Sequence, residues 1–146
     1  MYKKQAFIFD VDGTISQVGG RLTRHSGNDG YRAYKDAHDD VPDFPTLKIL
    51  ESLGAAGYFI IILTGRKLEG KEVLVEWLRI NGIIYDELLM REDDDHSKDY
   101  DLKRDIYVND IEPHFNVIGV FEDRSRNVEM WRELGLKCYQ VQPGDF

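Results

Sequence analysis

The sequence predicts an α/β fold in which helices cover both faces of a central parallel sheet. Short runs that are apolar almost throughout are typical of strands buried on both faces. Segments with helical apolar spacing separate these runs, and alternation of strand and helix is the pattern of a parallel sheet. At 146 residues, the chain is long enough for one domain with its own core.

Five apolar runs are expected to form strands, and three of them end directly before a polar or acidic residue. The expected strands are AFIF at 6–9, YFIIIL at 58–63, ELLM at 87–90, NVIGVF at 116–121 and LKCYQV at 136–141. Three further segments carry apolar side chains on one helical face and have residues typical of helix ends. The expected helices carry Leu47, Leu50 and Leu53 after Pro45; Val73, Leu74, Trp77 and Leu78 before Asn81-Gly82; and Val128, Trp131 and Leu134 before Gly135.

Residues 14–43 lack a sustained apolar period and directly follow the first expected strand. A long irregular insertion in a compact domain is usually functional or disordered, so we predict a flap or small cap over a site. The aromatic side chains of His25, Tyr31 and Tyr34 either stack on a bound base or pack this flap onto the core. No internal repeat or long linker divides the rest, which predicts a single domain over residues 1–146.

The composition of the chain limits the kinds of partner that it can bind. The formal net charge of −8 and pI near 4.9 argue against a broad basic surface for long nucleic acid, although a small basic site stays open. The single cysteine, Cys138, excludes an intrachain disulfide and is expected to be a buried thiol. No signal peptide or transmembrane run is evident, so no membrane partner and a cytoplasmic location are expected.

The stretch GRKLEGK at 65–71 resembles a phosphate-binding loop, but that motif requires Ser or Thr next, and Glu72 stands there. A carboxylate beside a phosphate is repelled by about 1–4 kcal/mol, depending on the local dielectric. The acidic run 92–96 does not form an EF-hand either, because Lys98 and Arg104 occupy the positions that require Gly and Glu. The four histidines lack zinc-ligand spacing, and the acidic run is expected to be a solvated loop.

Functional side chains gather where the strands end. Ligands of open parallel sheets bind beyond the carboxyl ends of the strands. There the sequence places Asp10 and Asp12, then Thr64-Gly65-Arg66, then Glu122-Asp123. So many carboxylates repel one another unless a divalent cation binds, and oxygen ligands select Mg²⁺. The structural alternatives are an ordinary turn after the first strand and a surface position for Arg66.

Together, these motifs resemble those of a known enzyme superfamily. FIFDVDGT at 7–14, LTGR at 63–66, a spaced lysine and an acidic pair resemble the haloacid dehalogenase (HAD) superfamily of phosphotransferases. More narrowly, DVDGT with Arg21 downstream, LTGR, KDYDLK at 98–103 and the tail 113–146 are similar to the 3′-phosphatase domain of phage-type polynucleotide kinase/3′-phosphatases. The resemblance implies a Rossmann-like, three-layer HAD sandwich with a small flap after the first strand.

The resemblance also implies roles for individual residues. Asp10 would be the nucleophile that forms an aspartyl-phosphate, and Asp12 the general acid and base. Of the candidates Lys98 and Lys103, the catalytic lysine falls on Lys103. Thr64, Gly65, Arg66 and Arg21 would contact the substrate phosphate, although Arg21 could equally be a solvated flap charge. Mg²⁺ would be held by Asp10, Asp12 and Asp123, with Glu122 and Asp99 one layer behind the ligands.

Two departures from the family pattern matter. Glu122 stands where an aspartate is usual, and the flap matches poorly after Arg21, which leaves the substrate range open. No other phosphate-binding loop occurs, so a free-standing phosphatase is expected, with room for a separate kinase or ligase partner. DNA, RNA and mononucleotide are not distinguished, and the oligomeric state is left open.

Three classes of function follow. The first is a Mg²⁺-dependent phosphomonoesterase that removes 3′-phosphates from polynucleotide ends, which predicts a local basic rim made by Arg21, Arg24, Arg32 and Lys35. The second is a phosphatase of nucleotides or other small phosphomonoesters, which the acidic charge favours. The third is a silent binding module, against which the intact set of catalytic residues argues.

Overall fold

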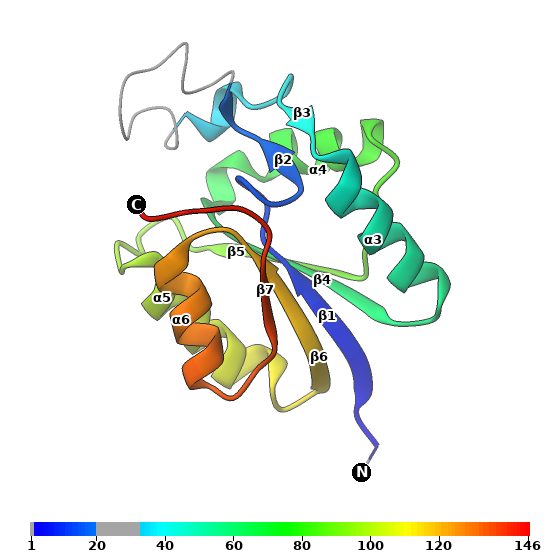
Figure 1. Cartoon of the computed structure of the whole chain (residues 1–146). Coiled ribbons are helices and arrows are strands. Elements are labelled where there is room, and N and C mark those ends of the chain that lie inside the picture. Colours follow the sequence, from blue (N-terminus) through cyan, green and yellow to red (C-terminus); the bar gives the residue numbers. More distant parts are fainter. Residues whose placement is uncertain (1, 20–32) are drawn as a thin grey trace.

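The computed structural model describes residues 2–19 and 33–146, and its centre is a five-stranded sheet in the order β5-β4-β1-β6-β7 (Figure 1). Every neighbouring pair in this sheet is parallel. The strands are β1 Lys4–Phe9, β4 Phe59–Lys67, β5 Glu87–Arg91, β6 Phe115–Glu122 and β7 Cys138–Gln140. The predicted fold class, a parallel α/β sheet, is confirmed.

Helices cover the sheet on both faces, as the apolar runs predict. Helices α3 (Phe44–Ala55) and α4 (Lys71–Ile80) lie on one face, and α5 (Asp99–Ile106) and α6 (Ser125–Glu133) on the other (Figure 1). Successive β1 side chains point to opposite faces. Phe7 and Phe9 therefore enter the core that contains Trp77 of α4, whereas Ala6 and Ile8 enter the core that contains Trp131 of α6.

Helix α5 was not predicted. Its sequence DYDLKRDI contains few apolar residues, so the helical period is weak, although an Asp101–Arg104 pair at 3.1 Å spans one turn. Leu102 is buried, and a π-helical turn at Tyr107–Ile111 continues the segment and adds buried apolar side chains. Tertiary packing therefore stabilises a helix that local pattern does not reveal.

The described parts of residues 14–43 are tied to the α4 side of the sheet. Strand β2 (Ser16–Gln17) pairs antiparallel with β3 (Val41–Pro42), and a 3₁₀ turn, η1, spans Tyr34–Asp36. The Tyr34 ring packs against Gly70, where an added Cβ would lie only 2.6 Å from the ring. The Tyr34 hydroxyl donates to Glu69 Oε1 at 2.6 Å. Of the two roles expected for Tyr34, base stacking or packing of the flap, the structure shows packing. His25 and Tyr31 lie outside the described residues.

Strand order reverses beside β1, because β4 and β5 lie on one side of it and β6 and β7 on the other. Such a reversal opens a crevice at the carboxyl ends of the two central strands. In the described part of the chain, no helix is long and apolar enough to cross a membrane. Cys138 is buried on β7, as expected, and burial and Glu122 raise its pKa to about 12.

Candidate active site

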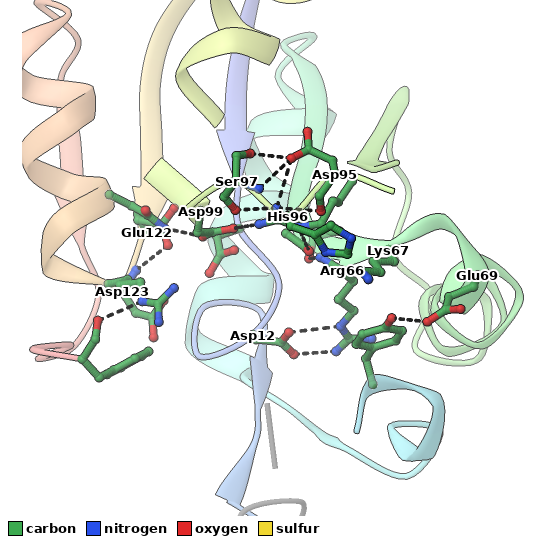
Figure 2. A pocket seen from close by; sticks show the side chains of 18 residues that line it. Asp12, Arg66, Lys67, Glu69, Asp95, His96, Ser97, Asp99, Glu122 and Asp123 are labelled. Carbon is green, nitrogen blue, oxygen red and sulfur yellow. Dashed lines mark hydrogen bonds and ion pairs between the residues drawn. The ribbon is translucent and has the colours of Figure 1, made fainter. Parts of the chain in front are cut away.

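A cleft of about 790 Å³ lies at the carboxyl ends of the strands (Figure 2). It gathers predicted site residues that are far apart in the sequence. Among its lining residues are Asp10, Asp12, Thr64, Gly65, Arg66, Asp99, Glu122 and Asp123. Lys103 is buried next to this cleft and reaches Asp10. Arg21 lies outside the described residues, as do Arg24 and Arg32 of the expected basic rim.

Asp10 is the first residue after β1, and its side chain is held on both oxygens. Its backbone N–H donates to the Phe121 carbonyl at 3.0 Å, which extends the β1–β6 pairing by one residue. Thr14 Oγ1 donates to Asp10 Oδ2 at 3.0 Å, and Lys103 Nζ donates to Oδ1 at 2.8 Å. Burial, followed by the negative charge of Glu122, raises the pKa of Asp10 well above its ordinary value. The carboxylate is thus fixed in orientation and crowded by negative charge.

Lys103 is the cation of this cluster. Only 1 % of the residue is exposed, and its Nζ donates to Glu122 Oε2 at 2.9 Å as well as to Asp10. Asp99 Oδ2 lies 3.6 Å from the same nitrogen. Burial works to lower the pKa of Lys103, but Asp10, Asp99 and Glu122 together hold it well above the ordinary value. The ammonium group therefore stays charged inside the protein.

The acidic pair after β6 has two different environments. Glu122 accepts from Lys103 on Oε2 and from the Asp123 backbone N–H on Oε1 at 3.2 Å, so both its oxygens are engaged. Burial, and next the charge of Glu122, raise the pKa of Asp123 to about 6. Asp10, Glu122 and Asp123 each offer an oxygen, and these atoms lie within 4.8 Å of one another. Crowded carboxylates of this kind fit a hard cation such as Mg²⁺, which would relieve their repulsion.

The backbone at position 13, within the DVDGT motif, requires glycine. Its φ of +81° lies in the left-handed region, which residues with a side chain rarely adopt. A Cβ at this position would also overlap Asp123 Oδ2. The turn after β1 and the loop after β6 therefore approach each other more closely than a side chain would allow. This close approach brings Asp10 and Asp123 into one cluster.

Arg66 faces Asp12 rather than the outer surface. Its Nε donates to Asp12 Oδ2 at 3.1 Å, and a terminal nitrogen donates to Oδ1 at 2.5 Å (Figure 2). Asp40, from the described end of the flap, lies 3.6 Å from the same guanidinium. Arg66 is 5 % exposed, so the surface alternative is wrong for this residue. Thr64 is also buried, and its hydroxyl accepts from the Arg66 backbone N–H at 3.2 Å.

Arg91 and Asn127 are among the site residues that the sequence reasoning missed. Arg91 ends β5 and donates to the Gly65 carbonyl at 2.9 Å and to Asp99 Oδ1 at 3.4 Å. Like Arg66, Arg91 is a polar residue at the end of a strand, and this is the sequence pattern that could have indicated it. Asn127, in the first turn of α6, donates to Asp99 Oδ2 at 2.7 Å and has no comparable signal. Although burial opposes it, Lys103 and the Asn127 bond lower the pKa of Asp99.

The acidic run 92–96 has a structural role in its loop. Asp93 accepts from the Glu69 backbone N–H at 2.9 Å, and Asp95 accepts from the Ser97 backbone N–H at 2.9 Å. The expectation of a solvated loop agrees with the exposure of most of its members. Lys35, the described member of the expected basic rim, is exposed and lies 3.5 Å from Glu69.

We expect Gly65→Ala to reduce the activity that the resemblance implies, phosphate release, about 100-fold, the effect of displacing a reacting group by roughly 1 Å. The added Cβ would overlap Asp99 Oδ1, so the partner of Lys103 must move. The measurement is kcat/KM for phosphate release, with circular dichroism to confirm folding. Gly54→Ala, on helix α3 where the nearest atom is 3.7 Å away, is the matched control. Equal activity of Gly65→Ala and wild type would contradict the role given to this contact.

Fold and site together define a HAD-type phosphatase domain. The chain belongs to the family of polynucleotide kinase phosphatase domains, whose model matches residues 4–146. The resemblance stated from the sequence is thereby confirmed at the level of the family.

Individual relatives agree with this assignment. Two solved structures of the Pnkp1/Rnl/Hen1 RNA repair complex contain a chain similar to this one, with 35 % and 34 % identity and TM-scores of 0.88 and 0.89. Each match covers 99 % of this chain but 48 % and 44 % of the other. A protein of Autographa californica nuclear polyhedrosis virus, described as a bifunctional polynucleotide kinase/RNA ligase, is 32 % identical over 133 residues. That match spans 90 % of this chain and 18 % of the relative.

More distant structures share the fold alone. A class C acid phosphatase from Bacillus anthracis, crystallised with tungstate, matches 99 % of this chain and 68 % of its own with a TM-score of 0.71 at 12 % identity. The chain thus spans about half or less of the repair proteins that it resembles at higher identity.

Proposed function

We propose that this domain is a Mg²⁺-dependent phosphomonoesterase that removes 3′-phosphates from polynucleotide ends through an aspartyl-phosphate on Asp10. The observation that carries this proposal is the Asp10 carboxylate itself. It lies in a cleft, is oriented by Thr14, and is contacted by a buried Lys103 ammonium at 2.8 Å. A fixed carboxylate beside a fixed cation is suited to attack phosphorus, because the cation stabilises the charge that develops on the phosphoryl oxygens.

The reaction proceeds in two displacement steps. In the first, an oxygen of Asp10 bonds to phosphorus while the bond between phosphorus and the 3′-oxygen breaks, and Asp12 gives its proton to that oxygen. In the second, the Asp12 carboxylate takes a proton from water, and the hydroxide attacks phosphorus and releases Asp10 and inorganic phosphate. Once Asp12 has given up its proton, Arg66 holds the resulting carboxylate through two hydrogen bonds, and Lys103 keeps its charge throughout.

We infer that Asp10, the Asp12 backbone carbonyl and Asp123 hold the cation. The resemblance to the family implies that Glu122 and Asp99 lie behind these ligands, and each of the two accepts hydrogen bonds on both of its oxygens. When bound, Mg²⁺ supplies positive charge to the phosphoryl oxygens and offsets the repulsion between the carboxylates. Thr64, Gly65 and Arg66 are proposed to contact the phosphate, and Arg21 is proposed to join them from the flap.

The cleft has room for a nucleotide, and the relatives favour a polynucleotide end as the substrate. The cleft volume of about 790 Å³ falls within the range of about 300–1,000 Å³ that is usual for ligand sites, so a nucleotide fits as well as a phosphoryl group. The relatives of higher identity belong to nucleic-acid repair proteins that combine kinase, ligase or RNA repair components. By that analogy, we propose that the domain acts with a kinase or ligase and that residues 14–43 form a flap over the substrate.

The test is a comparison of three substrates in the presence of Mg²⁺. We expect faster phosphate release from a 3′-phosphorylated oligonucleotide than from a 5′-phosphorylated oligonucleotide or a 3′-mononucleotide, and no release with EDTA. Equal or better turnover of the mononucleotide would favour the second candidate, a phosphatase of small phosphomonoesters. The net charge of −8 supports that candidate, because it repels long polyanions. Failure to release phosphate from any of them would contradict both.

We expect Asp123→Asn to have opposite effects on stability with and without Mg²⁺. In EDTA, removal of one charge from the crowded cluster raises Tm by about 2–6 °C, since each kcal/mol shifts the Tm of a domain of this size by about 2–4 °C. Mg²⁺ then no longer stabilises the variant. Thermal unfolding in EDTA and in Mg²⁺ measures both effects. Asp101→Asn, which removes a half-exposed carboxylate of α5 outside the cluster, serves as control. A normal Mg²⁺ response of Asp123→Asn would exclude Asp123 as a ligand.

A further inference from the structure

Arg124 and Phe146 form a stacked pair on the wall of the cleft. The Arg124 guanidinium lies over the Phe146 ring, 4.9 Å from its centroid, and Arg124 Nε donates to the Phe146 carbonyl at 2.9 Å. Both residues line the same cleft as Asp10. Phe146 nevertheless remains 45 % exposed, so the pair presents aromatic and guanidinium surface to a ligand. None of the catalytic steps proposed above uses either residue.

The position of Phe146 is fixed by the loop that carries Asp123. The Ser125 backbone N–H donates to the Gly144 carbonyl at 2.8 Å, and the Ser125 hydroxyl donates to Asp145 Oδ1 at 2.7 Å. Gly144 lies so close to this loop that a Cβ there would overlap the Asp123 carbonyl oxygen. Residues 144–146 are therefore tied to the acidic pair after β6, and the aromatic ring keeps a defined place relative to the nucleophile.

Tyr34, which also lines the described part of the cleft with a phenyl-type ring, is less suited than Phe146 to bind a base. Tyr34 packs its ring against Gly70, and its hydroxyl donates to Glu69. That end of the cleft carries charges of both signs: Glu69 lies there with its backbone N–H on Asp93 of the run 92–96, Lys35 lies 3.5 Å from Glu69, and Lys67 lines the cleft. Figure 2 places Glu69 and Asp123 at opposite ends of the site. Tyr34, which is hydrogen-bonded to Glu69, and Arg124, which follows Asp123 in the sequence, therefore lie at different ends of the cleft.

We propose that Arg124 and Phe146 form a stacking platform for the base of the nucleotide that carries the 3′-phosphate, an inference that rests on the proposed function. Aromatic rings and guanidinium planes are the side chains on which unpaired bases stack in nucleic-acid complexes. Every base has a flat face, so the platform selects a nucleoside end without selecting its sequence. The substrate class is a terminal nucleoside 3′-phosphate with any base.

The experiment compares two oligonucleotides of the same length. One ends in an ordinary nucleoside 3′-phosphate, and the other ends in an abasic 3′-phosphate. Their ratio of kcat/KM isolates the contribution of the base from that of the phosphate. We expect the ratio to fall about tenfold in Phe146→Ala, within the usual range for loss of one base–aromatic contact. We expect Phe146→Tyr to restore it, and Phe44→Ala, which removes an exposed phenylalanine at the start of α3, to leave it unchanged.

The possible results test the stacking platform separately from the proposed phosphatase function. A lower ratio in Phe146→Ala with recovery in Phe146→Tyr supports the platform. An unchanged ratio, or equal losses on both substrates, would overturn it while the wild-type activity leaves the phosphatase function intact. Absence of activity of the wild-type protein on both substrates would instead refute the proposed function and, with it, the platform.

Discussion

Replacement of Asp10 by asparagine will abolish phosphate release, with a loss in kcat of at least about 10⁴-fold, because it removes the proposed nucleophile and with it the reacting bond. The fold will survive the change. An amide can accept from Lys103 on its oxygen and donate to Thr14 on its nitrogen, in place of the contacts at 2.8 and 3.0 Å. The substitution also removes the carboxylate charge of Asp10, whose pKa is raised by burial and by Glu122. We therefore expect a Tm in EDTA equal to or above that of wild type.

Two measurements distinguish the nucleophile from a mere metal ligand. Wild-type protein mixed with a substrate labelled at the 3′-phosphate and quenched in acid will retain label as an acyl phosphate that hydroxylamine releases. Asp10→Asn will retain none. Asp12→Asn is the matched comparison, since it removes the proton donor but leaves the nucleophile in place. Label on a residue other than Asp10, or more than about 1 % residual turnover of pure Asp10→Asn, would refute the assignment.

Much of the sheet could be predicted because its strands carry an unbroken apolar signal. Residues 6–9 and 58–63 are apolar because they are buried on both faces, and the structure pairs them directly in β1 and β4. The strand-end rule likewise located Asp10, Thr64 and Glu122, since the carboxyl ends of parallel strands meet at one edge. The same rule applies to Arg91, which is the last residue of β5.

Other parts of the site depend on contacts that no local pattern records. Lys103 lies on a helix that was not predicted, and it contacts Asp10 across 93 positions of sequence. Only the resemblance to a family pointed to it. Asn127 fixes Asp99 between α6 and α5, a contact between two helices that carry no shared motif. The pairing of Arg66 with Asp12 also has no local signal, because the resemblance implies a separate role for each residue and no contact between them.

Replacement of Lys103 by methionine will lower both activity and stability. Three carboxylates, those of Asp10, Asp99 and Glu122, then share a buried site without their cation. Removal of one partner from a buried ion pair costs about 3–5 kcal/mol. For a domain of this length, that corresponds to a fall in Tm of roughly 6–20 °C in EDTA. Loss of the charge that is proposed to stabilise the phosphoryl oxygens will lower kcat at least about 10²–10³-fold.

The two effects of Lys103 can be separated by a second substitution. Lys103→Met combined with Glu122→Gln removes one of the unpaired charges, so we expect it to recover part of the lost Tm without recovering kcat. Lys48→Met is the matched control, because Lys48 is 74 % exposed on α3 and pairs with Glu51 at 3.4 Å. An exposed pair of this kind contributes at most about 1 kcal/mol. If the double variant regained activity with its stability, Lys103 would be a structural partner of Glu122 and have no part in the chemistry.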